Sequence, residues 1–177
     1  MKYLRLFENF ESQDNPSVEI PSWLEKKLED VHTKPGQGSI FAKSIPQVVD
    51  LIKKTLNETK DIKEIATTTG TLTIQSPGIG YNLVLPIDKA SSLEGAKEGV
   101  TTKVEGPNSI EVPSFETSQK INDFSSDTLT IIVRPKKDEQ GQALENQYIV
   151  LSAFPGDPDI PRASEWNGKY AVIIPKK

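Results

Sequence analysis

Apolar residues recur at helical spacing in a segment that begins near residue 21. Leu24, Leu28 and Val31 fall at i, i+4 and i+7, and charged residues occupy the positions between them. His32 follows directly, and then comes Thr33-Lys34-Pro35-Gly36, a typical helix stop. The pattern predicts an amphipathic helix from about residue 21 to His32.

A second and stronger helical pattern begins at Ser44-Ile45-Pro46-Gln47. Serine followed three residues later by glutamine fits a capping box, and proline is tolerated in the first turn of a helix. The apolar positions form a full helical stripe: Ile45, Val48, Val49, Ile52 and Leu56. This is the best-defined helix that the sequence predicts.

From about Glu64 onward the pattern changes to strands. Residues 88–99 fit either one helical turn or a loop. Segments 128–134 and 148–154 are the strongest strands, and a polar link, 135–147, favours a long-looped hairpin between them. Strict alternation in the second of these predicts Tyr148, Val150, Ser152 and Phe154 on one face. The predicted strands are 64–67, 71–75, 80–87, 100–104, 109–112, 128–134, 148–154 and 169–174.

Helices first and strands later indicate the α+β class. We expect the N-terminal helices to pack on one face of a mostly antiparallel β-sheet. Residues 1–20 read as a partly ordered N-terminal extension, and 21–177 as a single domain. The opening MKYLRLFENF resembles short leaders of tailed-phage and marine bacterial proteins, which implies a phage or bacterial origin.

Composition excludes several classes of site. The chain has no cysteine, which rules out disulfides, zinc–thiolate sites and thiol nucleophiles, and it has one histidine, which rules out a multi-histidine metal site. The net charge of −4 argues against non-specific coating of nucleic acid, although a local basic patch stays open. No apolar run is long enough for a membrane span. We therefore expect a cytoplasmic protein with no cofactor and no membrane partner.

Three side chains stand out as candidate catalytic groups. His32 has an ordinary pKa near neutrality, and a helix C-terminus favours its imidazolium form. Arg134 ends an apolar strand and is a planar anion-binding group. Ser152 interrupts an apolar run, so its hydroxyl needs a partner or a function. Each also has a purely structural interpretation: a polar helix end, a solvated strand end, or a hydroxyl bonded to the next strand.

A stiff segment rich in proline follows Ser152. We assign Phe154, Arg162 and Trp166, together with Lys136 beside Arg134, as candidate substrate-binding residues. Asp157 and Asp159 offer too few oxygens for a calcium site, so no metal site is expected. Alternatively, the proline-rich segment is itself a surface for a protein partner.

The order of these elements resembles the metal-independent RNases of the barnase–EndoU–colicin–RelE group, including its toxin and phage-borne branches. The specific match is residues 150–156, VLSAFPG, which is similar to a terminal strand of those branches. The resemblance implies transesterification of RNA to a 2′,3′-cyclic phosphate. It assigns proton transfer to His32, charge stabilisation to Arg134 and phosphate binding to Ser152.

The competing hypothesis is a non-catalytic accessory or binding protein, which the acidic charge and the single histidine favour. Geometry discriminates between the two. Hydrogen-bond reach through one substrate requires the three groups to lie within about 8 Å on one concave surface. A His32 on the far side of the sheet from Ser152 would favour the binding protein.

Overall fold

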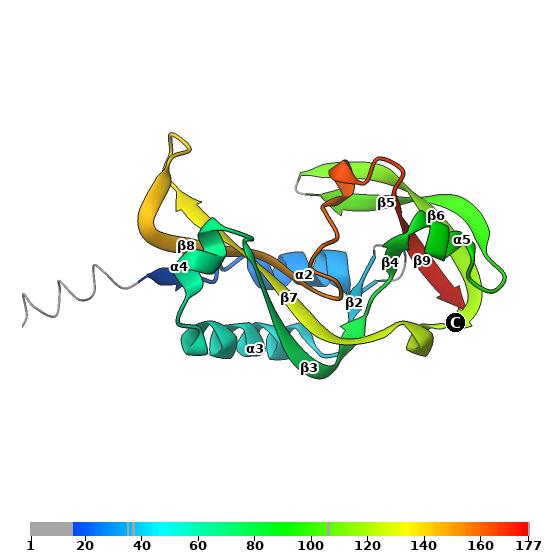
Figure 1. Cartoon of the computed structure of the whole chain (residues 1–177), viewed down its shortest axis with the longest axis horizontal. Helices are drawn as coiled ribbons and strands as arrows, with labels where there is room; N and C mark the ends of the chain where they lie inside the picture. Colours follow the sequence, from blue (N-terminus) through cyan, green and yellow to red (C-terminus); the bar gives the residue numbers. More distant parts are fainter. Residues whose placement is uncertain (1–15, 35, 37, 106, 177) are drawn as a thin grey trace, which may run out of the picture.

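The computed structural model describes residues 16–34, 36, 38–105 and 107–176. The chain is an α+β protein built on two sheets, each containing both parallel and antiparallel pairs (Figure 1). Five of the seven strand pairs described are antiparallel, so the expected mostly antiparallel pairing holds, but it is divided between two sheets rather than one. Most of the predicted extension, residues 1–15, lies outside the described residues, whereas residues 17–19 form a strand.

The five-stranded sheet has the order β1-β8-β7-β3-β2. β8 and β7 form the predicted antiparallel hairpin, and β3 pairs antiparallel with β7. β1 adds to β8 in parallel, and β2 adds to β3 at the other edge. The strands are β1 (Ser17–Glu19), β2 (Ile40–Phe41), β3 (Thr71–Tyr81), β7 (Ser125–Lys137) and β8 (Ala143–Pro155).

The four-stranded sheet has the order β4-β9-β6-β5 and lies at the opposite end of the molecule in Figure 1. β5 and β6 form an antiparallel hairpin, while β9 is inserted between β4 and β6 and runs parallel to β6. The strands are β4 (Val84–Pro86), β5 (Lys97–Glu105), β6 (Asn108–Lys120) and β9 (Tyr170–Lys176).

Both predicted helices are confirmed. α2 (Leu24–His32) buries Leu24, Leu28 and Val31, and α3 (Ile45–Glu58) begins with the predicted capping box at Ser44. Two short helices, α4 (Ile62–Thr67) and α5 (Ile87–Ser91), and two 3-10 turns, η1 (Ile121–Phe124) and η2 (Ala163–Glu165), complete the described elements.

The largest core lies between these helices and the five-stranded sheet. Leu129, Ile131 and Val133 of β7 are fully buried in it, as the alternation of that strand predicts. They pack with Leu28 of α2 and Ile52 of α3 in one cluster. At roughly 2 kcal/mol for each fully buried aliphatic side chain, this cluster is a major source of stability.

Two predicted strands differ from the structure. Residues 64–67 belong to α4, because Ile62, Ile65 and Ala66 are spaced as on a helix, and Ile62 and Ala66 are buried. The strand expected over 80–87 is interrupted at Asn82-Leu83, where the chain leaves one sheet for the other. There the amide of Asn82 donates to the Phe124 carbonyl, and the Leu83 carbonyl accepts from the amide of Ile173.

Candidate functional site

A groove of about 1880 Å³ runs between the two sheets. One wall is formed by α2 and by the outer face of the β7–β8 hairpin. The other is formed by the tip of the β5–β6 hairpin and the segment from Pro158 to Trp166. Figure 1 shows α2 in the middle of the molecule, between the two sheets that supply these walls. The groove is therefore built from segments that are far apart in the sequence.

A β-bulge determines which residues of β8 face this groove. Ile132 pairs with Ser152 but Val133 pairs with Val150, so Leu151 is an extra residue. The predicted alternation is therefore wrong beyond Val150. Tyr148 and Val150 point into the core, where Ala153 joins them, whereas Ser152 and Phe154 line the groove.

All three candidate catalytic residues line the groove, together with Phe154, Arg162 and Trp166. Arg134 lies two residues beyond Ile132, the partner of Ser152, so Arg134 and Ser152 share the outer face of the hairpin. His32 ends α2 beside Phe154, and the centroids of the two rings are 6.3 Å apart. His32 is thus on the same side of the sheet as Ser152.

His32 is held in a defined orientation. It is only 8 % exposed, its ring meets Phe41 edge-on, and its Nδ1 lies 2.8 Å from the carbonyl oxygen of Ser39. A carbonyl oxygen can only accept, so Nδ1 carries the hydrogen. In the neutral ring this leaves Nε2 as a proton acceptor.

The pKa of His32 is lowered to about 3, first by burial and then by the positive charges of Lys103 and Lys27, against the opposing effect of the Ser39 hydrogen bond. The expectation that the helix end would favour the imidazolium form is therefore wrong. Removal from water and two nearby ammonium groups outweigh the helix dipole, whose effect is small and confined to the last turn. The imidazole is neutral at neutral pH.

The guanidinium of Arg134 contacts the backbone. Its Nη1 donates to the Gly70 carbonyl at 2.5 Å and to the Val133 carbonyl at 3.0 Å. Gly70 has a positive φ of 70°, and a Cβ there would lie 1.8 Å from that same Nη1. Arg134 therefore fixes the turn that leads into β3, and part of its hydrogen-bonding capacity is used for this.

Two lysines in the groove were not identified from the sequence. Lys27 donates from Nζ to the Leu151 carbonyl at 2.6 Å, and its ammonium lies 5.7 Å from the ring centroid of Trp23. The side chain of Lys103, on β5, extends to the segment before β2: its Nζ would lie 3.3 Å from a Cβ added to Gly38. Burial lowers the pKa of both ammonium groups; for Lys103 the carboxylate of Glu105 opposes this effect and the charge of Lys27 adds to it. The only local feature of the sequence that could have indicated Lys27 is its spacing from Trp23, one helical turn away.

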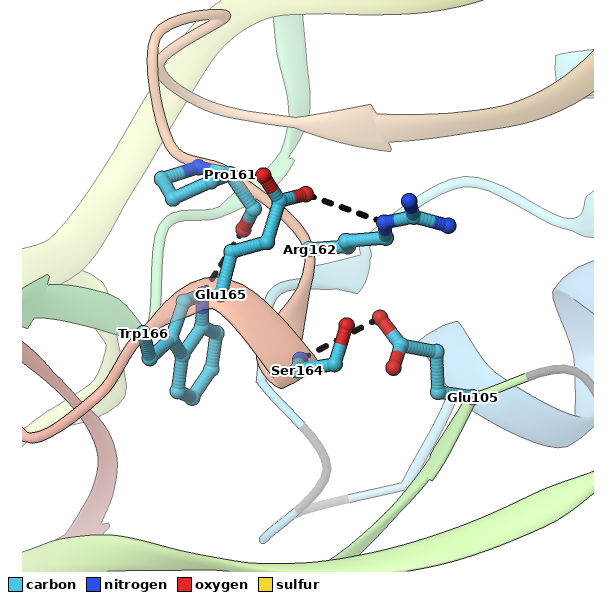
Figure 2. A network of polar contacts seen from close by, with 6 residues as sticks. All are labelled: Glu105, Pro161, Arg162, Ser164, Glu165 and Trp166. Carbon is cyan, nitrogen blue, oxygen red and sulfur yellow. Dashed lines mark hydrogen bonds and ion pairs between the residues drawn. The ribbon is translucent and has the colours of Figure 1, made fainter.

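The far wall is held by a small polar network, shown in Figure 2. The indole of Trp166 is 2 % exposed and donates to the Pro161 carbonyl at 2.7 Å. Arg162 pairs with Glu165, and the amide of Ser164 donates to the carboxylate of Glu105 at the end of β5. Trp166 therefore holds its segment against the four-stranded sheet, with most of its ring inside a core cluster.

Lys136, the remaining candidate, lies outside the groove. It forms an ion pair with Glu19 of β1 at the opposite edge of β8. Among the residues that the structure describes, no cluster of acidic or histidine side chains suits a metal ion, and no helix is long and apolar enough to cross a membrane. No protein-family model, curated protein or solved structure matches the chain.

Proposed function

We propose that the groove binds single-stranded RNA and that the protein cleaves it by metal-independent transesterification. The observation that supports this most is that His32, Arg134 and Ser152 all line the groove, although they come from a helix end and two strands. Arg134 lies four residues along β7 from Thr130, the partner of Phe154, which is roughly 13 Å at about 3.3 Å per residue, so the spacing of about 8 Å expected for all three groups is not met at Arg134. The aromatic rings of Trp23 and Phe154 line it as well, and such rings can stack on unpaired bases.

In this proposal His32 acts as the proton acceptor. Its Nε2 would take the proton of the ribose 2′-OH as that oxygen attacks the adjacent phosphorus, and the 5′-oxygen would leave with a proton from water. A pKa of about 3 makes a weak base. A phosphate bound beside the imidazole would raise this pKa, because a nearby negative charge stabilises the protonated ring. The hydroxyl of Ser152 would hold a phosphate oxygen.

The decisive experiment is cleavage of a fluorescent single-stranded RNA in EDTA. We expect a 2′,3′-cyclic phosphate product and loss of cleavage in His32→Asn, which keeps a donor toward Ser39. Ser152→Ala should slow cleavage, whereas Ser109→Ala, at the rim of the same groove, should not. Undiminished cleavage by His32→Asn would show that His32 has no part in the mechanism. The absence of cleavage of any RNA would refute the proposed enzymatic activity.

The second candidate is a protein that binds its anionic ligand in the groove without cleaving it. Two observations favour it. His32 is neutral and a weak base before a ligand binds, and Arg134 spends hydrogen bonds on the Gly70 and Val133 carbonyls. RNA that binds with an affinity dependent on the groove lysines, but is recovered intact after prolonged incubation, would establish this alternative.

A further inference from the structure

The groove contains positive charge from both of its walls. Lys27 comes from α2, which packs on the five-stranded sheet, and Lys103 comes from β5 at the edge of the four-stranded sheet. Each ammonium is close enough to lower the pKa of His32, and all three side chains line the groove. Two half-buried cations and a neutral imidazole therefore share one end of the groove.

Among the described residues, five cationic side chains and four carboxylates line the groove, so the acidic residues offset only part of this charge. Asp30 pairs with Lys26 and Glu165 pairs with Arg162, all four with exposed side chains at the rim. Glu105 acts on Lys103 but also accepts the amide of Ser164. Asp159 lies on the proline-rich segment, where its amide donates to the carboxylate of Asp157. The inner groove keeps an excess of positive charge.

Hydrogen-bond donors other than the lysines lie at the same place. The Oδ1 of Asn82 accepts from Ser39 and from the amide of Val84, which leaves the amino group of that amide as a donor. Ser152 adds a hydroxyl. Donors without net charge beside two ammonium groups are what an oxyanion such as phosphate requires.

We propose that Lys27 and Lys103 form a phosphate-binding site that spans the groove, so that a bound phosphate links the two sheets. The choice of phosphate as the anion rests on the proposed function. Bringing both ammonium groups out of water is unfavourable for the free protein, and a doubly charged oxyanion between them offsets this. The ligand would thereby contact α2 and β5 at once, and it would hold the β5–β6 hairpin against α2.

The test uses inorganic phosphate at constant ionic strength. We expect phosphate to raise the melting temperature of the full chain, because it binds the folded state. Lys27→Met and Lys103→Met should each weaken phosphate binding about tenfold or more, the loss expected for one charge-assisted hydrogen bond. Lys26→Met, one residue away on the same helix but exposed and paired with Asp30, should bind like the unchanged protein.

A second measurement does not depend on the variants folding well. The ring signal of His32, the only histidine, should shift in the unchanged protein as phosphate is added, and its pKa should rise. Equal phosphate affinity in all three lysine variants, or an unmoved His32 signal at saturating phosphate, would overturn the site. Phosphate binding that depends on the lysines, without RNA cleavage, would refute only the proposed enzymatic activity. RNA cleavage at an unchanged rate in both lysine variants would refute only this phosphate site.

Discussion

Replacing His32 should change how stability depends on pH, and the effect can be calculated. In the folded protein the pKa of His32 is about 3, against 6.5 for an ordinary histidine. The folded state therefore keeps the ring neutral while the unfolded chain takes up a proton below about pH 6.5. This stability is fully present above pH 6.5, and it is lost progressively as the pH falls toward 3.

The magnitude follows from the two pKa values. Relative to neutral pH, protonation of the unfolded chain removes about 1 kcal/mol of unfolding free energy at about pH 5.5 and about 3 kcal/mol at about pH 4.5. His32→Asn cannot take up this proton. Its amide nitrogen occupies the place of Nδ1 and can still donate to the Ser39 carbonyl, while the lost ring contacts with Phe41 and Phe154 weaken the protein equally at every pH.

The assay is urea unfolding, followed by tryptophan fluorescence, of both proteins at several pH values between 7.5 and 4.5. Carboxylates titrate in both proteins, so the informative quantity is the difference between their unfolding free energies. The unfolding free energy of the unchanged protein, relative to that of His32→Asn, should fall by about 3 kcal/mol over this interval. Parallel loss of stability in the two proteins would refute the reasoning, and so would a His32 ring signal that titrates near pH 6.5 in the folded protein.

Two further experiments test the packing that holds the groove together. Gly80→Ala should destabilise the protein by several kcal/mol, because its Cβ would lie 2.4 Å from a carbonyl oxygen of β2. In the control Gly99→Ala the nearest contact of the new Cβ is 3.3 Å away, so the loss of stability should stay within about 1 kcal/mol. Urea unfolding measures both losses, and equal losses would contradict the packing argument. Trp166→Phe should cost about 1–3 kcal/mol, since it leaves the Pro161 carbonyl without its donor; thermal unfolding measures this, and an unchanged melting temperature would show that the indole does not hold the segment.

The sequence predicts local elements well because their causes are local. The stripe and capping box of α3 lie within one segment, and the alternation of β7 correctly identifies its buried face. β1 and β2 are too short to show any periodicity, and the parallel pairing of β6 with β9 depends on contacts between distant segments. The pairing of these strands therefore cannot be predicted from the residues next to them in the sequence.

The candidate site shows the same division. His32, Arg134 and Ser152 were selected by residue type and position, and all three line the groove. The bulge at Leu151 that turns Ser152 toward the groove leaves no signature in the alternation of the strand. The prediction for the charge state of His32 was wrong because burial in the folded protein, and to a smaller extent the charges of Lys103 and Lys27, lower its pKa. The charge state of such a side chain depends on tertiary contacts, and its position at a helix end does not predict it.

The position of β9 has a consequence for how the chain is made. β9 is a central strand of the four-stranded sheet, between β4 and β6, yet it follows all its partners in the sequence. During synthesis, which adds about 5–20 residues each second, β4 and β6 must wait for residues 170–176 before they can be joined. The five-stranded sheet has all of its strands once residue 155 has emerged. One wall of the groove can therefore form on the ribosome before the other, and the groove closes only when β9 arrives.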